Sequence, residues 1–188
     1  MARKYMTLRR YGGKARMASW IMPVIEKIAK ENDLHTLVDV FGGGGTIALA
    51  ATKITDNKGN PWFKKIYYND NETSLVTLMR VLKDANKTSQ LVSYLGKTTY
   101  TKSNWTKAHE MSKKINAGNT DGMSDIDIAW AHFVNTMLSR DSAGNEYIKP
   151  KVYKTRNILL GYKNKILELP KFTGPLQQIE IFEVDYLD

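Results

Sequence analysis

A run of four glycines at positions 42–45 constrains this chain more than any other feature of its sequence. The residues before the run, Leu37, Val38 and Val40, are apolar, and residues 47–51 favour a helix. Glycine lets the backbone turn with positive φ and approach a ligand closely. The first N–H groups of the following helix then point at whatever is bound there. This order predicts a buried strand, a tight turn and a helix start, which open a nucleotide-binding α/β unit.

The type of cofactor depends on the acidic residues around the run. Residues 43–48 fit the dinucleotide pattern G-x-G-x-x-A, and Asp70 stands near the position of a ribose-binding acid. Asp39, however, lies at the end of the predicted strand, where its carboxylate would repel a pyrophosphate and attract a cation. S-adenosylmethionine carries an ammonium and a sulfonium group and no phosphate. The pattern Asp39-x-Phe41-x-Gly43-x-Gly45 therefore favours S-adenosylmethionine, with a nucleotide-dependent oxidoreductase as an alternative.

Composition excludes several classes of protein. The 188 residues suffice for one domain with a small insertion. The chain has no cysteine, so it has neither disulfides nor thiolate metal sites, and it fits a reducing, cytoplasmic setting. No apolar run approaches the roughly 18 residues of a membrane helix, so we expect no membrane association. His109 and His132 have no acids at ligand spacing, so we predict structural roles for them and no metal site.

The charge is concentrated in the middle of the chain. Residues 85–175 contain fourteen basic and seven acidic residues, a net charge of +7, and the whole chain has a net charge of +9. Such a basic segment favours a polyanionic partner, and basic residues interleaved with aromatic ones are typical of nucleic-acid binding. The candidates for DNA contact are Arg140, Lys149, Lys151, Lys154 and Arg156, with Tyr147 and Tyr153 among them.

Apolar periodicity predicts the remaining elements. One amphipathic helix carries Met17, Trp20, Ile21, Val24, Ile25 and Ile28, and another has Leu75, Leu78, Met79 and Leu82 on its core face. Further helices are predicted over residues 47–54, 101–115 and 125–140, and strands over 65–68 and 178–184. The second strand ends at Asp70, a candidate for the ribose hydroxyls, with Glu72 as the second choice. The third ends at Asp185 and Tyr186.

Three short motifs occur in order along the first half of the chain: Tyr11-Gly12-Gly13-Lys14, then residues 39–45, then Asn69-Asp70-Asn71-Glu72. Together they resemble successive motifs of the adenine-specific (N6) DNA methyltransferases, in the Dam-like alpha class. The resemblance implies a Rossmann-like, S-adenosylmethionine-dependent methyltransferase sheet with a mostly helical insertion. Its substrate would be double-stranded DNA.

The resemblance also implies roles for individual residues. Lys14 and Asp39 would bind the methionine part of S-adenosylmethionine, and Asp70 would bind its ribose. Gly43 and Gly45 would form the turn. Asp185 would accept a hydrogen bond from the amino group of the cofactor's adenine, with the aromatic Tyr186 beside it. The matching motifs add the cofactor-binding candidates Tyr11, Gly13 and Phe41. Residues 1–84 would be the cofactor-binding part, 85–175 the basic target-recognition insertion, and 176–188 the third strand.

The catalytic motif of that family is missing from the sequence. Adenine methyltransferases place Asp-Pro-Pro-Tyr at the end of the fourth strand, where it holds the flipped adenine. None of the five prolines here stands in such a motif, so no catalytic residue is assigned. A sheet of three strands would also leave the first strand with an open edge, which invites pairing. We therefore expect a truncated or split enzyme, completed by a second chain or by self-association. The alternative is a non-catalytic cofactor- or DNA-binding module.

Overall fold

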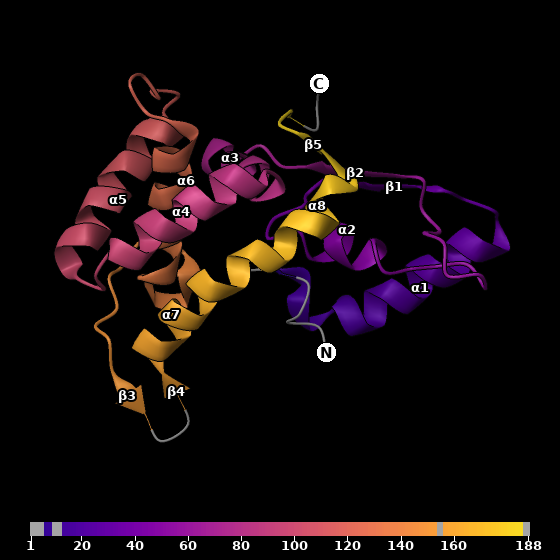
Figure 1. Cartoon of the computed structure of the whole chain (residues 1–188), viewed down its shortest axis with the longest axis horizontal. Helices are drawn as coiled ribbons and strands as arrows, with labels where there is room; N and C mark the ends of the chain where they lie inside the picture. Colours follow the sequence, from indigo (N-terminus) through magenta and orange to yellow (C-terminus); the bar gives the residue numbers. More distant parts are fainter. Residues whose placement is uncertain (1–5, 9–12, 154–155, 186–188) are drawn as a thin grey trace.

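The computed structural model describes residues 6–8, 13–153 and 156–185. Within them the chain is a mixed α/β protein in which helices predominate (Figure 1). The helices are α1 (Ala18–Glu31), α2 (Thr46–Ala51), α3 (Thr73–Lys83), α4 (Ala85–Lys97), α5 (Lys102–Asn116), α6 (Asp125–Met137), α7 (Ile158–Glu168) and α8 (Thr173–Gln177). The strands are β1 (Thr36–Asp39), β2 (Lys65–Asn69), β3 (Val152–Tyr153), β4 (Arg156–Asn157) and β5 (Ile179–Phe182). None of the helices in this part of the chain is long and apolar enough to cross a membrane.

A parallel sheet in the order β1-β2-β5 carries the N-terminal half of the fold. Leu37, Ile66 and Ile179 lie side by side across the three strands and are all buried. Their face of the sheet is covered, since α2 contacts β1 and β2 while α3 and α8 contact β5 (Figure 1). Short apolar strands of this kind are typical of parallel sheets, whose side chains are normally buried on both faces.

The opposite face of the sheet is largely exposed in the described part of the chain. Val38 is 59% exposed and Phe182 is 43% exposed, with the Tyr67 ring between them in edge contact with Phe182. Our expectation that Val38 and Val40 belong to a buried strand was therefore wrong. Among the described strands, β1 pairs only with β2, so the edge that we expected to be open lacks a neighbour.

The predicted apolar face of α1 is also largely in contact with solvent. Trp20 is 72% exposed, and Met17, Val24 and Ile28 are exposed as well. The helix is anchored by the small buried residues Ala18 and Ala29, together with Ile21 and Ile25 of the predicted face, which are partly buried against the core. Periodicity located the helix correctly, but only part of the predicted apolar face contacts the core. The sheet face and most of the α1 stripe thus present apolar side chains to solvent.

The basic middle of the chain is mostly helical, as predicted. Helix α6 packs against α3 and α5 around the buried rings of Trp130 and Phe133. A capping box begins α6, because Ser124 Oγ accepts from the Asp127 N–H while Asp127 accepts from the Ser124 N–H. The helix ends at Met137, three residues before the predicted end.

Other element boundaries shift by a few residues, for local reasons. Helix α2 ends at Ala51 and not at Ile54, because the Thr52 hydroxyl donates to the Leu49 carbonyl and tighter turns follow. Strand β2 extends to Asn69, whereas β5 stops at Phe182. The predicted core face of α3 is confirmed, since Leu75, Leu78, Met79 and Leu82 are all buried.

Candidate functional site

The glycine run forms the turn between β1 and α2, and its glycines are required by the geometry. Gly45 has φ of 74°, in the left-handed region that side chains rarely adopt. Gly42 lies against the Tyr68 ring, where a Cβ atom would come within 2.2 Å of a ring carbon. The turn is thus pressed onto β2, which brings its backbone next to the residues at the end of that strand.

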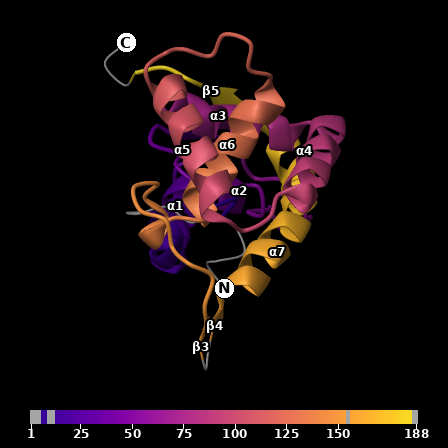
Figure 2. The ribbon, with the colours of Figure 1, turned by 90° about the vertical axis from the view of Figure 1, so that its left-hand side faces the viewer.

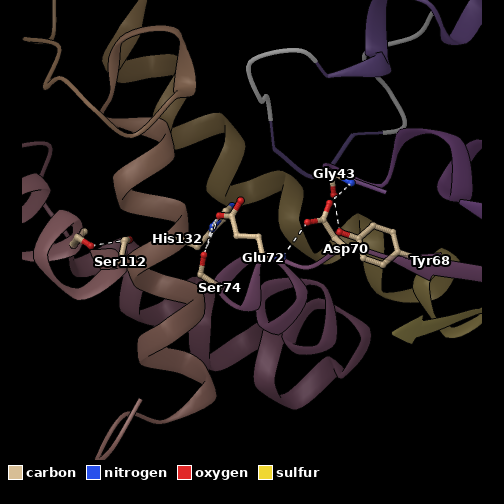
Figure 3. A network of polar contacts seen from close by, with 8 residues as sticks. Gly43, Tyr68, Asp70, Glu72, Ser74, Ser112 and His132 are labelled. Atoms are coloured by element: carbon tan, nitrogen blue, oxygen red, sulfur yellow. Dashed lines mark hydrogen bonds and ion pairs between the residues drawn. The ribbon is translucent and has the colours of Figure 1, made fainter. Parts of the chain in front are cut away.

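Asp70 fixes this turn from the end of β2. Its Oδ2 accepts from the Gly43 N–H at 2.9 Å, and its Oδ1 accepts from the Glu72 N–H at 3.1 Å (Figure 3). The Tyr68 hydroxyl donates to the Gly43 carbonyl at 2.7 Å. A carboxylate has about four lone-pair positions, so Asp70 retains capacity for further donors. The structure places Asp70 as a clamp on the turn, and its predicted role toward a ribose stays a prediction.

Asp39 is a buried carboxylate in which, among the described residues, only one oxygen has a hydrogen-bond partner. The residue is 7% exposed, and Lys14 Nζ lies 3.0 Å from Oδ1. Lys14 also donates to the Phe41 carbonyl, so it bridges the end of β1 and the start of the turn. Among the described residues Oδ2 has no hydrogen-bond partner. A buried charged oxygen without a donor is costly, and a cationic or hydrogen-donating ligand would satisfy it.

Asn69 joins the carboxyl ends of all three strands, a role that sequence reasoning missed. Its side-chain amide donates to the carbonyls of Val40 and Val184, at 3.2 and 3.0 Å. Its Oδ1 accepts from the Val184 N–H at 3.0 Å. Asp39 ends β1, and Asp70 and Asp185 follow β2 and β5, so the three acids stand at strand ends that Asn69 ties together at one edge of the sheet. Lys14 reaches this edge from the N-terminal side and Gly13 directly precedes it, whereas Tyr11 and Tyr186 lie outside the described residues.

A second polar cluster lies just beyond Asp70 and includes a histidine. His132 of α6 is 5% exposed, and its Nδ1 lies 2.8 Å from Ser74 Oγ and 3.1 Å from Glu72 Oε1. Figure 3 shows the Glu72 and Ser74 side chains directed toward His132, on the side away from Gly43. His132 has a nearby acid after all, because the fold brings together residues sixty positions apart.

Comparison with known proteins decides the family. The family model described as D12 class N6 adenine-specific DNA methyltransferase matches residues 11–170. The chain belongs to this family. A search of curated proteins finds no match.

Proteins of this family are enzymes that methylate N6 of adenine in DNA. Such DNA methyltransferases generally use S-adenosylmethionine. The match covers the glycine turn, Asp70 and the whole helical part as far as Pro170. The likeness that three short motifs suggested is thereby confirmed for most of the chain.

The predicted DNA-contacting residues of this methyltransferase differ in their surroundings. Arg140 is already paired, since its guanidinium contacts both carboxylate oxygens of Glu146, at 2.9 and 3.2 Å. Lys149 and Lys151 are exposed on the segment that enters the β3–β4 hairpin, which projects from the helical part in Figure 2. Arg156 begins β4, although its side chain is not among those described, and Lys154 lies outside the described residues.

Proposed function

We propose that this D12-class chain binds S-adenosylmethionine at the edge formed by Lys14, Asp39, the glycine turn and Asp70, in a Rossmann-like sheet. The observation that carries the proposal is Asp39 Oδ2, a buried carboxylate oxygen without a donor among the described residues. The methionine part of the cofactor presents an ammonium and a carboxylate. Asp39 and Lys14, 3.0 Å apart, offer one charge of each sign for them.

The other residues of the proposed site position the cofactor. The turn at Gly43 and Gly45 has little side-chain bulk and admits a ligand close to the backbone. Asp70 would accept hydrogen bonds from the ribose hydroxyls while still accepting from the Gly43 N–H. Asp185 would accept from the amino group of the cofactor's adenine. When bound, S-adenosylmethionine supplies an electrophilic methyl group on its sulfonium. The chain then has to orient an adenine amino nitrogen toward that methyl and exclude water.

For the second substrate we propose double-stranded DNA, contacted through the basic insertion. Lys149 and Lys151 are exposed, as phosphate contacts require. The Arg140 guanidinium would have to break its ion pair with Glu146 before it could contact a phosphate. Phosphate contacts of this kind position the duplex without reading its sequence.

We further propose that methyl transfer requires a strand that pairs with the open edge of β1 and carries Asp-Pro-Pro-Tyr. The open edge, together with the exposed Val38 and Phe182, supports this part of the proposal. Parallel sheets normally have both faces covered, and unpaired edges recruit further strands.

Transfer of tritiated methyl from S-adenosylmethionine to DNA tests the function directly. We expect N6-methyladenine when the chain is mixed with a polypeptide that supplies an Asp-Pro-Pro-Tyr strand, and little with the chain alone. Cofactor binding without methyl transfer in both mixtures would instead favour a non-catalytic binding module.

A further inference from the structure

Residues 6–8, called the N-terminal strap below, lie against the glycine turn although they belong to no helix or strand. All three residues are buried, and Thr7 and Leu8 are both 0% exposed. The Thr7 N–H and the Thr7 hydroxyl both donate to the Gly44 carbonyl, at 3.0 and 3.1 Å. Irregular segments normally run over the surface, because their backbone groups need partners that water can supply. A buried one is held by specific contacts, as this strap is.

The strap accounts for the glycine at position 44 of the turn. Gly43 and Gly45 have positive φ, whereas Gly44 does not, so φ by itself does not call for glycine there. A Cβ atom on Gly44, however, would lie 2.6 Å from the Leu8 carbonyl oxygen. That oxygen belongs to the backbone and cannot swing aside as the end of a side chain can. Contact with the strap therefore requires glycine at this position.

A lysine of α7 holds the strap from its other end. Lys165 Nζ donates to the Met6 carbonyl at 3.0 Å, and the lysine side chain is only 14% exposed. The same ammonium lies 3.2 Å from Glu168 Oε2 and 5.2 Å from the centroid of the Phe172 ring. A hydrogen bond from an ammonium to a carbonyl is stronger than one between neutral groups, and burial makes it costly to lose. Lys165 thus fixes the strap to α7.

The strap connects two parts of the chain that have different proposed partners. Helix α7 begins directly after β4, so Lys165 belongs to the same segment as the β3–β4 hairpin (Figure 2). From Lys165 the contacts continue through Met6 and Thr7 to Gly44, in the middle of the turn. In the sequence, Lys14 of the cofactor edge follows shortly after the strap.

We infer that Thr7 and Lys165 are positioning residues, which hold the glycine turn in the geometry that S-adenosylmethionine requires. Both act through Gly44, and neither is a candidate for contact with the cofactor. A binding site keeps its geometry only when the residues around it are themselves held in place. The inference rests on the proposed function, because it assumes that the cofactor binds at this turn.

A substitution of Lys165 tests the inference in the full chain. Lys165→Met removes the ammonium and keeps most of the side-chain length. We expect it to weaken binding of S-adenosylhomocysteine about three- to tenfold, the effect of one hydrogen bond. Lys163→Met, the same change at an exposed position of α7, should leave the affinity unchanged. Titration calorimetry measures both.

Two substitutions of Thr7 separate positioning from packing. Thr7→Val keeps the shape of the side chain but loses the hydroxyl, so it should weaken cofactor binding by a similar factor. Thr7→Ser keeps the hydroxyl and should bind nearly as the wild type does. A side chain that served only to fill the core would give the opposite order, because serine lacks the buried methyl group that valine retains.

Amide hydrogen exchange gives a readout that needs no ligand. The Gly43 N–H is bonded to Asp70, and the Gly45 N–H is bonded to the Gly42 carbonyl. Both amides should exchange faster in Lys165→Met and in Thr7→Val than in the wild type. The amide of Ala108, a buried residue of α5, should exchange at the same rate in all three proteins.

Wild-type affinities and exchange rates in Lys165→Met and Thr7→Val would overturn the inference. Faster exchange at Ala108 to the same extent as at the turn would also overturn it, because the strap would then support global stability only. Wild-type binding that is sensitive to Asp39→Asn would still support the cofactor site in either case. A wild-type chain that binds no S-adenosyl compound would overturn the proposed function and the cofactor role of the strap, whereas faster exchange confined to the turn would still show that the strap holds it.

Discussion

At the scale of single residues, the proposed cofactor site depends most on Asp39. Its carboxylate is buried, holds one ion pair with Lys14, and keeps one oxygen without a partner among the described residues. A purely structural acid would be expected to use both oxygens, as Asp70 does with two backbone N–H groups. Asp39 thus differs from its neighbour in being incompletely satisfied, and a bound ammonium would remove the difference.

Replacing this carboxylate should weaken cofactor binding. Asp39→Asn keeps the shape of the side chain but removes its charge, so we expect the affinity for S-adenosylhomocysteine to fall by about ten- to a hundredfold. Hydrogen bonds to charged groups are worth about 1.5–3 kcal/mol, which sets this range. Titration calorimetry measures it. Asp121→Asn, the same change at an exposed loop residue, is the control, and an equal loss in both variants would contradict the assignment.

Sequence reasoning identified the acids of this edge but not how they are held. Asp39, Asp70 and the glycines are close in sequence to the strands that position them, so local patterns suffice to find them. The contact between Glu72 and His132, and the bonds from Asn69 to Val184, join residues far apart along the chain. Such contacts depend on the packing of α6 on α3 and on the sheet order, which no local pattern specifies.

At the scale of elements, the turn between β1 and α2 depends on backbone conformations open only to glycine. Gly45→Ala should lower the free energy of unfolding by about 1–2 kcal/mol, because alanine disfavours the left-handed region. A Cβ atom there would also meet Met79 Cε at 2.6 Å. Urea denaturation monitored by circular dichroism measures the change.

A glycine inside a helix supplies the matched control. Gly96 lies within α4, and a Cβ atom there meets no other atom within 4 Å. Gly96→Ala should therefore raise the free energy of unfolding by about 0.5–1 kcal/mol, because alanine favours the helix. If both variants shift stability in the same direction, the argument for the turn is wrong.

Periodicity recovered the three strands of the sheet and helices α1, α2, α3, α5 and α6, since apolar spacing is a local property, but it did not predict α4, α7 or α8. It failed on which surfaces would be covered. The α1 stripe and the β1 side chains have the composition of buried faces, yet Trp20 and Val38 are exposed. An amphipathic pattern indicates that a segment has an apolar side. Whether that side is buried depends on another element of the fold packing against it.

At the scale of the whole molecule, the bare sheet face and the open edge of β1 make association the expected behaviour. Unpaired strand edges beside exposed apolar side chains recruit other chains. Sedimentation velocity should show species larger than the 21.4 kDa monomer, increasing with concentration. Val38→Lys should shift the population toward monomer, because it places a charge on that face.

Leu167→Lys is the control for this experiment. Leu167 is 70% exposed on α7, outside the sheet, so the same kind of substitution should leave association unchanged. A wild-type chain that stays monomeric across the whole concentration range would count against the sheet face as a docking surface.

The most direct test of the central claim is calorimetry of the wild-type chain with three ligands: S-adenosylmethionine, S-adenosylhomocysteine and NAD. A cofactor site at Asp39 predicts measurable binding of the first two and weaker or absent binding of NAD, because Asp39 attracts an ammonium and repels a pyrophosphate. A folded chain that gives no heat with either S-adenosyl compound, or that binds NAD more tightly, would contradict it.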